Sequence, residues 1–213
     1  MIIDSKDTLE AAARHYGVLP FFTNCVDGFS VEEMAAPGIL FGDECDDYGC
    51  WDWKGPVIRE QTTAYGKFFR RKAGFVSLDL LPHFLNYRRD AYALHPGTIE
   101  ADLLEAVTRR EGATSAELRR LLGIAGKRHS IEAPLQRLQM GGHLLIADFE
   151  YKYTRLGDRY GWGVALYSTP EIWLGESAAQ AGCTPAESLH RMVTAVSSRI
   201  PGADIAMIRR LLR

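Results

Sequence analysis

The densest group of side chains able to do chemistry lies between positions 51 and 69, where the sequence reads WDWKGPVIREQTTAYGKFF. Aromatic rings there could stack a nucleobase that has left its helix, while a carboxylate transfers a proton. The residues that could line such a pocket are Trp51, Asp52, Trp53, Lys54, Arg59, Glu60, Gln61 and Tyr65. Among them, the candidate catalytic residues are Asp52, Glu60 and Tyr65. The alternative, which we favour, is that the tryptophans anchor a core and the charged groups pair, because tryptophan is usually well buried.

The spacing of cysteine and histidine does not predict a metal site. Cys45 and Cys50 are separated by four residues in a carboxylate-rich stretch, and a zinc site would need two further ligands. Neither Cys25 nor Cys183 has a second cysteine or a histidine at short ligand spacing. The histidines are scattered, at His15, His83, His95, His129, His143 and His190. Since the sequence also contains no nucleophile elbow and no phosphate-binding glycine loop, we predict neither a metal nor a cofactor.

Residues 127–142 have the composition of a helix that can read DNA. At 100° per residue, its apolar side is formed by Ile131, Leu135, Leu138 and Gly142. The opposite side presents His129, Ser130, Ala133, Gln136, Arg137 and Met140. Glutamine and arginine can each form two hydrogen bonds to a base edge, and basic residues just before a helix lie where phosphate is favoured. The candidate DNA contacts here are Lys127, Arg128, His129, Gln136 and Arg137.

Basic and aromatic side chains alternate near the turn between two strand-like runs, Leu144–Tyr153 and Tyr160–Ser168. This pattern suits a β-hairpin that lies along a sugar-phosphate backbone. The candidate contacts in the hairpin are Lys152, Tyr153, Arg155 and Arg159. The alternative is a solvated hairpin or a protein-docking surface, because the nearby acids offset these bases one for one. Those acids are Asp148, Glu150 and Asp158.

Three short helices must position this hairpin. Ile99, Leu103, Leu104 and Val107 share one helical face, and Gly112 ends that helix. Thr114 and Glu117 have capping-box spacing at the start of a second helix, and a third is expected from about 130 to 141. Three helices followed by a hairpin is the order of a winged helix, in which the third helix can enter the major groove. We therefore predict an α+β fold that is mostly helical, with a winged helix in its C-terminal half.

The remainder of the chain is expected to be helical and packed on this module. Asp7 and Glu10 have the spacing to cap a first helix, from about Thr8 to Tyr16, and Ser77 is expected to cap a helix that ends near Arg89. His95-Pro96-Gly97 then breaks the chain. Two further helices follow after 170, with Thr184 and Asp204 as their expected caps. We predict an N-terminal region over 1–97, the winged helix over 98–170, and C-terminal helices over 171–213 that complete the same compact unit.

The overall charge excludes a polycation. The chain has 213 residues, with 25 basic and 27 acidic side chains and a formal charge of −2. Acids cluster between 27 and 52 and bases between 54 and 72, which predicts solvated faces that neutralise each other, or a basic strip beside a phosphate chain. No signal-peptide pattern opens the sequence, and no apolar run approaches the ~18 residues that a membrane span needs. We therefore expect a cytoplasmic protein with reduced thiols and no membrane partner.

Specific segments of this sequence resemble a known family. They are GVLPFFTNCVDGFSVEE (17–33), WDWKGPVIREQTTAYGKFF (51–69), KAGFVSLDLLPHFLNYRR (72–89), LQRLQMGGHLL (135–145) and YGWGVALYSTPE (160–171). Together they are similar to a family of bacterial proteins related to the AlkZ-type alkylpurine DNA glycosylases. The resemblance implies a winged-helix DNA-binding module with a link to DNA repair. It implies no catalytic residues, because AlkZ-type enzymes carry Gln-x-Gln or Gln-x-Asp, and Gln61, Gln136 and Gln139 stand in neither pattern.

The hypothesis from sequence is a winged-helix protein that binds double-stranded DNA without performing chemistry on it. One alternative is a DNA glycosylase-like enzyme that acts on modified bases, with the 51–65 cluster as its pocket. Another is a winged-helix module that binds a protein partner, in which the acidic stretch from 27 to 52 takes part.

Overall fold

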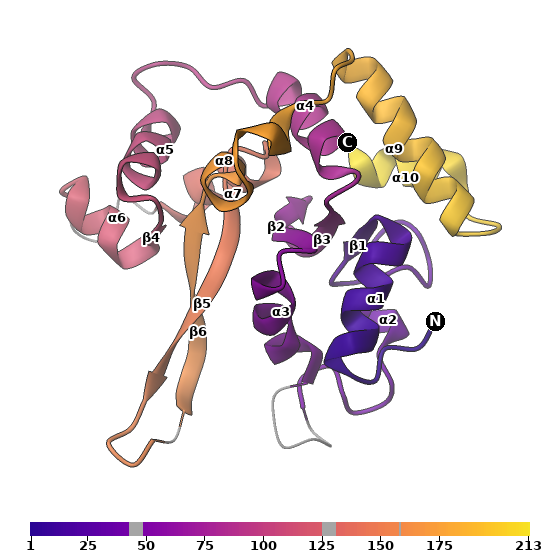
Figure 1. The fold of residues 1–213 in the computed structure, drawn as a ribbon, viewed down its shortest axis with the longest axis horizontal. Coiled ribbons are helices and arrows are strands. Elements are labelled where there is room, and N and C mark those ends of the chain that lie inside the picture. Colours follow the sequence, from indigo (N-terminus) through magenta and orange to yellow (C-terminus); the bar gives the residue numbers. More distant parts are fainter. Residues whose placement is uncertain (43–48, 125–130, 158) are drawn as a thin grey trace.

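The computed structural model describes residues 1–42, 49–124, 131–157 and 159–213. It has an α+β fold in which helices surround two small antiparallel sheets of three strands each (Figure 1). The predicted α+β class is confirmed. In the part of the chain that is described, no helix combines the length and the apolar character needed to cross a membrane.

The first sheet belongs to the N-terminal part of the chain and has the strand order β1-β3-β2. Its strands are β1 (Val18–Pro20), β2 (Thr63–Phe69) and β3 (Lys72–Ser77). The helices of this part are α1 (Lys6–Tyr16), α2 (Val31–Met34), α3 (Gly49–Arg59) and α4 (Leu81–Ala91). The 51–69 segment divides into helix α3 and the edge strand β2.

Two predicted helix starts were wrong. Helix α1 begins at Lys6 because Ser5, not Asp7, is its N-cap: the Ser5 hydroxyl accepts a hydrogen bond from the Thr8 amide, and the Thr8 hydroxyl accepts one from the Ser5 amide. Ser77 does not cap a helix either. It ends strand β3, and its hydroxyl donates to the carbonyl of Gly17 at 3.0 Å. The next helix, α4, starts later, so that Pro82 falls in its first turn, where no amide donor is required.

The second sheet has the strand order β4-β6-β5 and is built with three helices. Its elements are α5 (Ile99–Arg110), β4 (Ala113–Thr114), α6 (Ser115–Leu121), α7 (Glu132–Met140), β5 (Leu145–Tyr153) and β6 (Arg159–Ser168). The capping box of Thr114 and Glu117 is present, with the Thr114 amide donating to Glu117 Oε2 at 2.8 Å. The short strand β4 was not predicted, because two residues carry no readable periodicity.

The C-terminal segment contributes α8 (Pro170–Leu174), a 3-10 helix (Glu176–Ala179), α9 (Pro185–Arg199) and α10 (Ile205–Leu212). Helix α9 packs on α4 and α10, and Figure 1 shows these three helices together beside the N-terminal sheet. The predicted caps of these helices are confirmed: the side chain of Thr184 caps α9 and the side chain of Asp204 caps α10.

Buried apolar side chains form two clusters. The larger one joins the N-terminal sheet to α4, α9 and α10 and includes Leu145 and Ile146 from the base of β5. The smaller one lies between α5, α6 and α7; its members are Leu103, Val107, Ala113, Leu118, Ile131, Leu135, Leu138 and Leu144. The three-helix region thus has a core of its own, while the β5–β6 hairpin shares the core of the N-terminal part.

Candidate nucleic-acid interface

Helix α7 presents a basic side chain to solvent, because its apolar side faces inward as predicted. Ile131, Leu135 and Leu138 are at most 2% exposed. On the other side, the side chain of Arg137 is 64% exposed, and its Nε lies 3.6 Å from Glu100 Oε1. Gln136 is half-buried beside it. The candidate contacts Lys127, Arg128 and His129 lie outside the described residues.

One glutamine of α7 is committed to the protein interior. Gln139 is 1% exposed; its Oε1 accepts a hydrogen bond from the Lys67 amide at 2.9 Å, and its Nε2 donates to the Leu135 carbonyl at 3.1 Å. Because β2 is an edge strand, this side chain satisfies a backbone donor that has no partner strand. The sequence signal for its burial is spacing, since position 139 is four residues after the buried Leu135. Gln139 therefore fastens α7 to the N-terminal sheet.

The β5–β6 hairpin projects away from α7 and runs beside α3 (Figure 1). Near its tip, Lys152 and Arg155 are exposed and the Tyr153 side chain is 60% exposed. Arg159 opens β6 opposite Tyr153 in the strand register. The tip therefore offers cationic and aromatic groups to a ligand.

The base of the hairpin, in contrast, is packed against α3. The ammonium of Lys54 lies 4.0 Å from the ring centre of Trp51 and 4.6 Å from that of Phe149 on β5. The Trp51 ring also meets the Trp162 ring edge-on at 6.2 Å, and Arg59 Nη1 pairs with Asp148 Oδ1 at 2.9 Å. These contacts hold the hairpin against α3, and both tryptophans of that helix pack against the larger apolar cluster.

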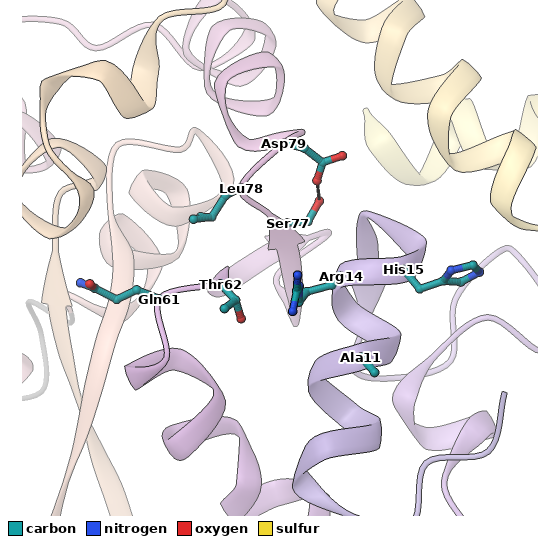
Figure 2. Close-up of a pocket in the computed structure, with 8 residues that line it drawn as sticks. All are labelled: Ala11, Arg14, His15, Gln61, Thr62, Ser77, Leu78 and Asp79. Carbon is teal, nitrogen blue, oxygen red and sulfur yellow. Dashed lines mark hydrogen bonds between the residues drawn. The ribbon is translucent and has the colours of Figure 1, made fainter.

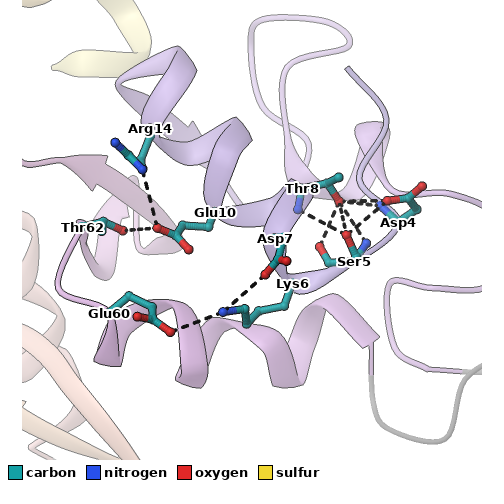
Figure 3. Close-up of polar contacts among 9 residues, drawn as sticks. All are labelled: Asp4, Ser5, Lys6, Asp7, Thr8, Glu10, Arg14, Glu60 and Thr62. Atoms are coloured by element: carbon teal, nitrogen blue, oxygen red, sulfur yellow. Dashed lines mark hydrogen bonds and ion pairs between the residues drawn. The ribbon is translucent and has the colours of Figure 1, made fainter.

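The three candidate catalytic residues have different surroundings. Asp52 is 8% exposed on α3. Glu60 is at the surface, where its Oε1 lies 3.3 Å from the ammonium of Lys6 (Figure 3). Tyr65 is 2% exposed between aromatic rings, and burial, with a smaller effect of Tyr151, raises its pKa far above its ordinary value. A phenol in that state is a poor proton donor at neutral pH.

A hollow of about 690 Å³ lies between α1, the start of β2 and the end of β3. Figure 2 shows Arg14, Thr62 and Asp79 around it. Burial alone would raise the pKa of Asp79, but hydrogen bonds from the Ser77 hydroxyl and the Arg199 guanidinium outweigh this and hold it below its ordinary value. Glu10 accepts a hydrogen bond from the Thr62 hydroxyl at 3.0 Å, and its Oε1 lies 4.0 Å from Arg14 Nη1 (Figure 3).

A cluster that the sequence did not predict joins α4 to the start of α9. The sulfur of Cys183 lies 3.7 Å from His83 Nδ1 and 3.3 Å from the Ser188 hydroxyl, and Asn86 Nδ2 donates to the Cys183 carbonyl at 2.8 Å. Burial, followed by the charge of Arg191, lowers the pKa of His83. The cluster combines residues about 100 positions apart, so no local spacing could reveal it. Within the described residues, no group of three or more potential ligands is placed to hold a metal.

The comparison with family models covers almost the whole chain: the model described as AlkZ related matches residues 3–213. The chain belongs to the AlkZ-related family. The resemblance inferred from the sequence segments is thereby confirmed. No curated protein and no solved structure matches this AlkZ-related chain. Membership relates the chain to DNA-repair glycosylases. The sequence contains no Gln-x-Gln and no Gln-x-Asp.

Proposed function

We propose that this AlkZ-related chain is a cytoplasmic protein that binds double-stranded DNA in a repair context, with residues 98–170 as a winged helix. The strand order β4-β6-β5, with β4 between the first two helices, supports this interpretation. The separate apolar cluster of α5, α6 and α7 supports a distinct unit, on which 1–97 and 171–213 pack. The free thiols among the described residues fit a reducing compartment.

The observation that carries the proposal is the orientation of α7. Its leucines are enclosed while Arg137 faces solvent, and the exposed bases Lys152 and Arg155 lie on the hairpin that follows. In this arrangement α7 would contact base edges, and the hairpin tip would contact the flanking phosphates. Because Gln139 and the base of the hairpin are packed against the N-terminal part, DNA would contact this unit at the outer side of α7 and at the hairpin tip.

A salt titration of binding to a labelled duplex tests this function. Arg137→Ala is expected to weaken binding to a preferred sequence, by about tenfold or more, since a two-pronged base contact contributes about 1–3 kcal/mol of discrimination. Arg155→Ala is expected to weaken binding to all sequences alike and to reduce the salt slope by about 0.9. Arg191→Ala on α9, which removes the same charge from a distant helix, is the matched control. Absence of salt-dependent binding by the wild-type chain at low ionic strength contradicts the proposal.

The family relation also favours a second candidate, a glycosylase-like enzyme that acts on modified bases. Incubation of the chain with alkylated duplexes, followed by detection of abasic sites, tests it. If the activity exists and uses Asp52, then Asp52→Asn abolishes abasic-site formation, while Glu60→Gln has little effect because Glu60 is paired with Lys6 at the surface. Binding without formation of abasic sites supports DNA binding and contradicts the glycosylase-like activity.

The third hypothesis, a protein-docking winged helix, makes a different prediction. A partner captured by the purified chain should remain bound after nuclease treatment, and Arg137→Ala should not change DNA retention. Loss of all captured material on nuclease treatment favours DNA as the partner.

A further inference from the structure

A hollow of about 500 Å³ lies between the β2–β3 turn and α10, on a surface not included in the proposed interface. Four arginines line it together with Ile205 and Ala206; they are Arg70, Arg209, Arg210 and Arg213. Arg70 comes from the turn and the other three from the last turn and end of α10. In the described part of the chain, none of these arginines forms an ion pair with a side-chain carboxylate.

Helix stability explains only part of this cluster. One or two cations in the last turn of α10 compensate the negative end of the helix dipole. Arg70 arrives from a different element, where it adds repulsion among like charges that no side-chain ion pair of the described residues relieves. A bound anion would relieve that repulsion, and arginine side chains match phosphate oxygens by two parallel hydrogen bonds.

The backbone conformation of the β2–β3 turn also indicates that the arginine side chains contact a ligand. Arg70 and Arg71 form the two-residue connection between the strands, with φ of 50° and 68°. This left-handed region favours glycine, asparagine or aspartate, and two arginines in succession are strained there. Both side chains are exposed, so packing does not account for them. Strained residues that bear charge at a surface are typical of a ligand contact.

Strand β2 links this hollow to α7. The Lys67 amide is bonded to Gln139 of α7, and Arg70 follows three residues later, which is about 10 Å along a strand. The turn thus lies near the inner side of α7, and a duplex of about 20 base pairs, with phosphates about 3.4 Å apart along each strand, is long enough to reach both the turn and the outer side of α7.

We infer that the arginine hollow formed by the β2–β3 turn and α10 binds the phosphate backbone of DNA, as a second anchoring site beside α7. This inference rests on the proposed DNA-binding function and extends it to a surface outside residues 98–170. The hollow makes no base contacts, so it increases affinity for every sequence and adds no discrimination.

The test is a salt titration with the full chain and a duplex of about 20 base pairs. The double variant Arg70→Asn/Arg210→Gln removes two exposed charges, and its salt slope is expected to fall by about 1.8, at about 0.9 for each phosphate contact. Asparagine tolerates a positive φ, so the turn should remain folded, and thermal unfolding of the variant checks this. Arg70→Lys/Arg210→Lys keeps the charges and should retain most of the slope. Arg109→Gln is the matched control, because Arg109 is exposed and already paired with Glu105.

The outcomes separate the two proposals. An unchanged salt slope in the double variant, with binding still weakened by Arg137→Ala, contradicts the phosphate site in the hollow and is consistent with the α7 interface. A reduced slope in the double variant, with no effect of Arg137→Ala or Arg155→Ala, supports the hollow and overturns the α7 interface. If the wild-type chain binds vesicles with 30% phosphatidylserine through the same arginines and binds no DNA, both proposals are wrong.

Discussion

Replacement of Gln139 by leucine tests whether α7 is held by its bond to β2. Leucine has nearly the same volume as glutamine but cannot accept the hydrogen bond from the Lys67 amide. An orphaned buried donor costs about 1–3 kcal/mol. We expect the free energy of unfolding to fall by about 2 kcal/mol, which corresponds to about 4–8 °C in the melting temperature for a chain of this size.

Thermal unfolding followed by circular dichroism measures this effect, and Gln136→Leu is the control. Gln136 is half-buried on the same helix, so its replacement should change the free energy of unfolding by no more than about 0.5 kcal/mol. DNA affinity should fall in the Gln139 variant even where it is fully folded, because α7 loses a fixed position relative to the N-terminal sheet.

Gln139→Glu provides a second, pH-dependent measurement. Burial in this site is expected to raise the pKa of the new carboxyl above its unfolded value of about 4.3. The protonated acid can both accept from Lys67 and donate to Leu135, as glutamine does. At low pH, the free energy of unfolding of the variant should therefore be close to that of the wild type at the same pH. As the pH rises through the folded-state pKa of the new carboxyl, the variant should lose stability. If Gln139→Leu melts at the wild-type temperature and binds DNA equally well, the bond does not position α7.

Three other predictions concern the rest of the fold. Arg88 is 1% exposed and donates to two backbone carbonyls, so Arg88→Met should lower the free energy of unfolding by about 3 kcal/mol in urea titrations, and an unchanged midpoint would contradict this role. Burial is the main effect that lowers the pKa of His143, although its hydrogen bond to the Tyr92 carbonyl opposes this. As the pH falls below about 6.5, the unfolded chain therefore takes up a proton before the folded chain does, and the free energy of unfolding declines. His143→Gln should make that decline smaller. Arg59→Ala breaks a half-exposed pair with Asp148 and should cost no more than about 1 kcal/mol; a larger loss would show that the pair holds the hairpin.

Local sequence patterns predicted the elements whose signals are local. The capping boxes at Thr114 and Thr184 fix helix starts through contacts three residues apart, and the inward side of α7 follows from the helical repeat. Specific segments also predicted the AlkZ-related family correctly. The start of α1 was mispredicted because more than one polar residue could serve as its cap. The start of α4 was mispredicted because its N-cap, Leu80, forms no side-chain cap hydrogen bond, so no polar residue marks it.

The candidate site likewise has some features that residue spacing predicted and others that only the folded chain creates. That Gln136 and Arg137 lie away from the leucine face could be read from spacing. That the base of the hairpin is packed on α3 could not, because it depends on Trp51, Lys54 and Phe149, which meet only after folding. The Cys183–His83 contact and the arginine hollow likewise join segments about 100 or more positions apart.

The sequence by itself therefore determined the family, the α+β class and the outward side of the third helix of the 98–170 region, since each depends on residues a few positions apart or on whole segments. The tertiary structure decided which polar groups are accessible to a ligand. It enclosed Gln139 and Tyr65, paired Glu60 with Lys6, and brought Arg70 to α10. Availability depends on which distant surfaces exclude water, and local spacing carries no information about those contacts.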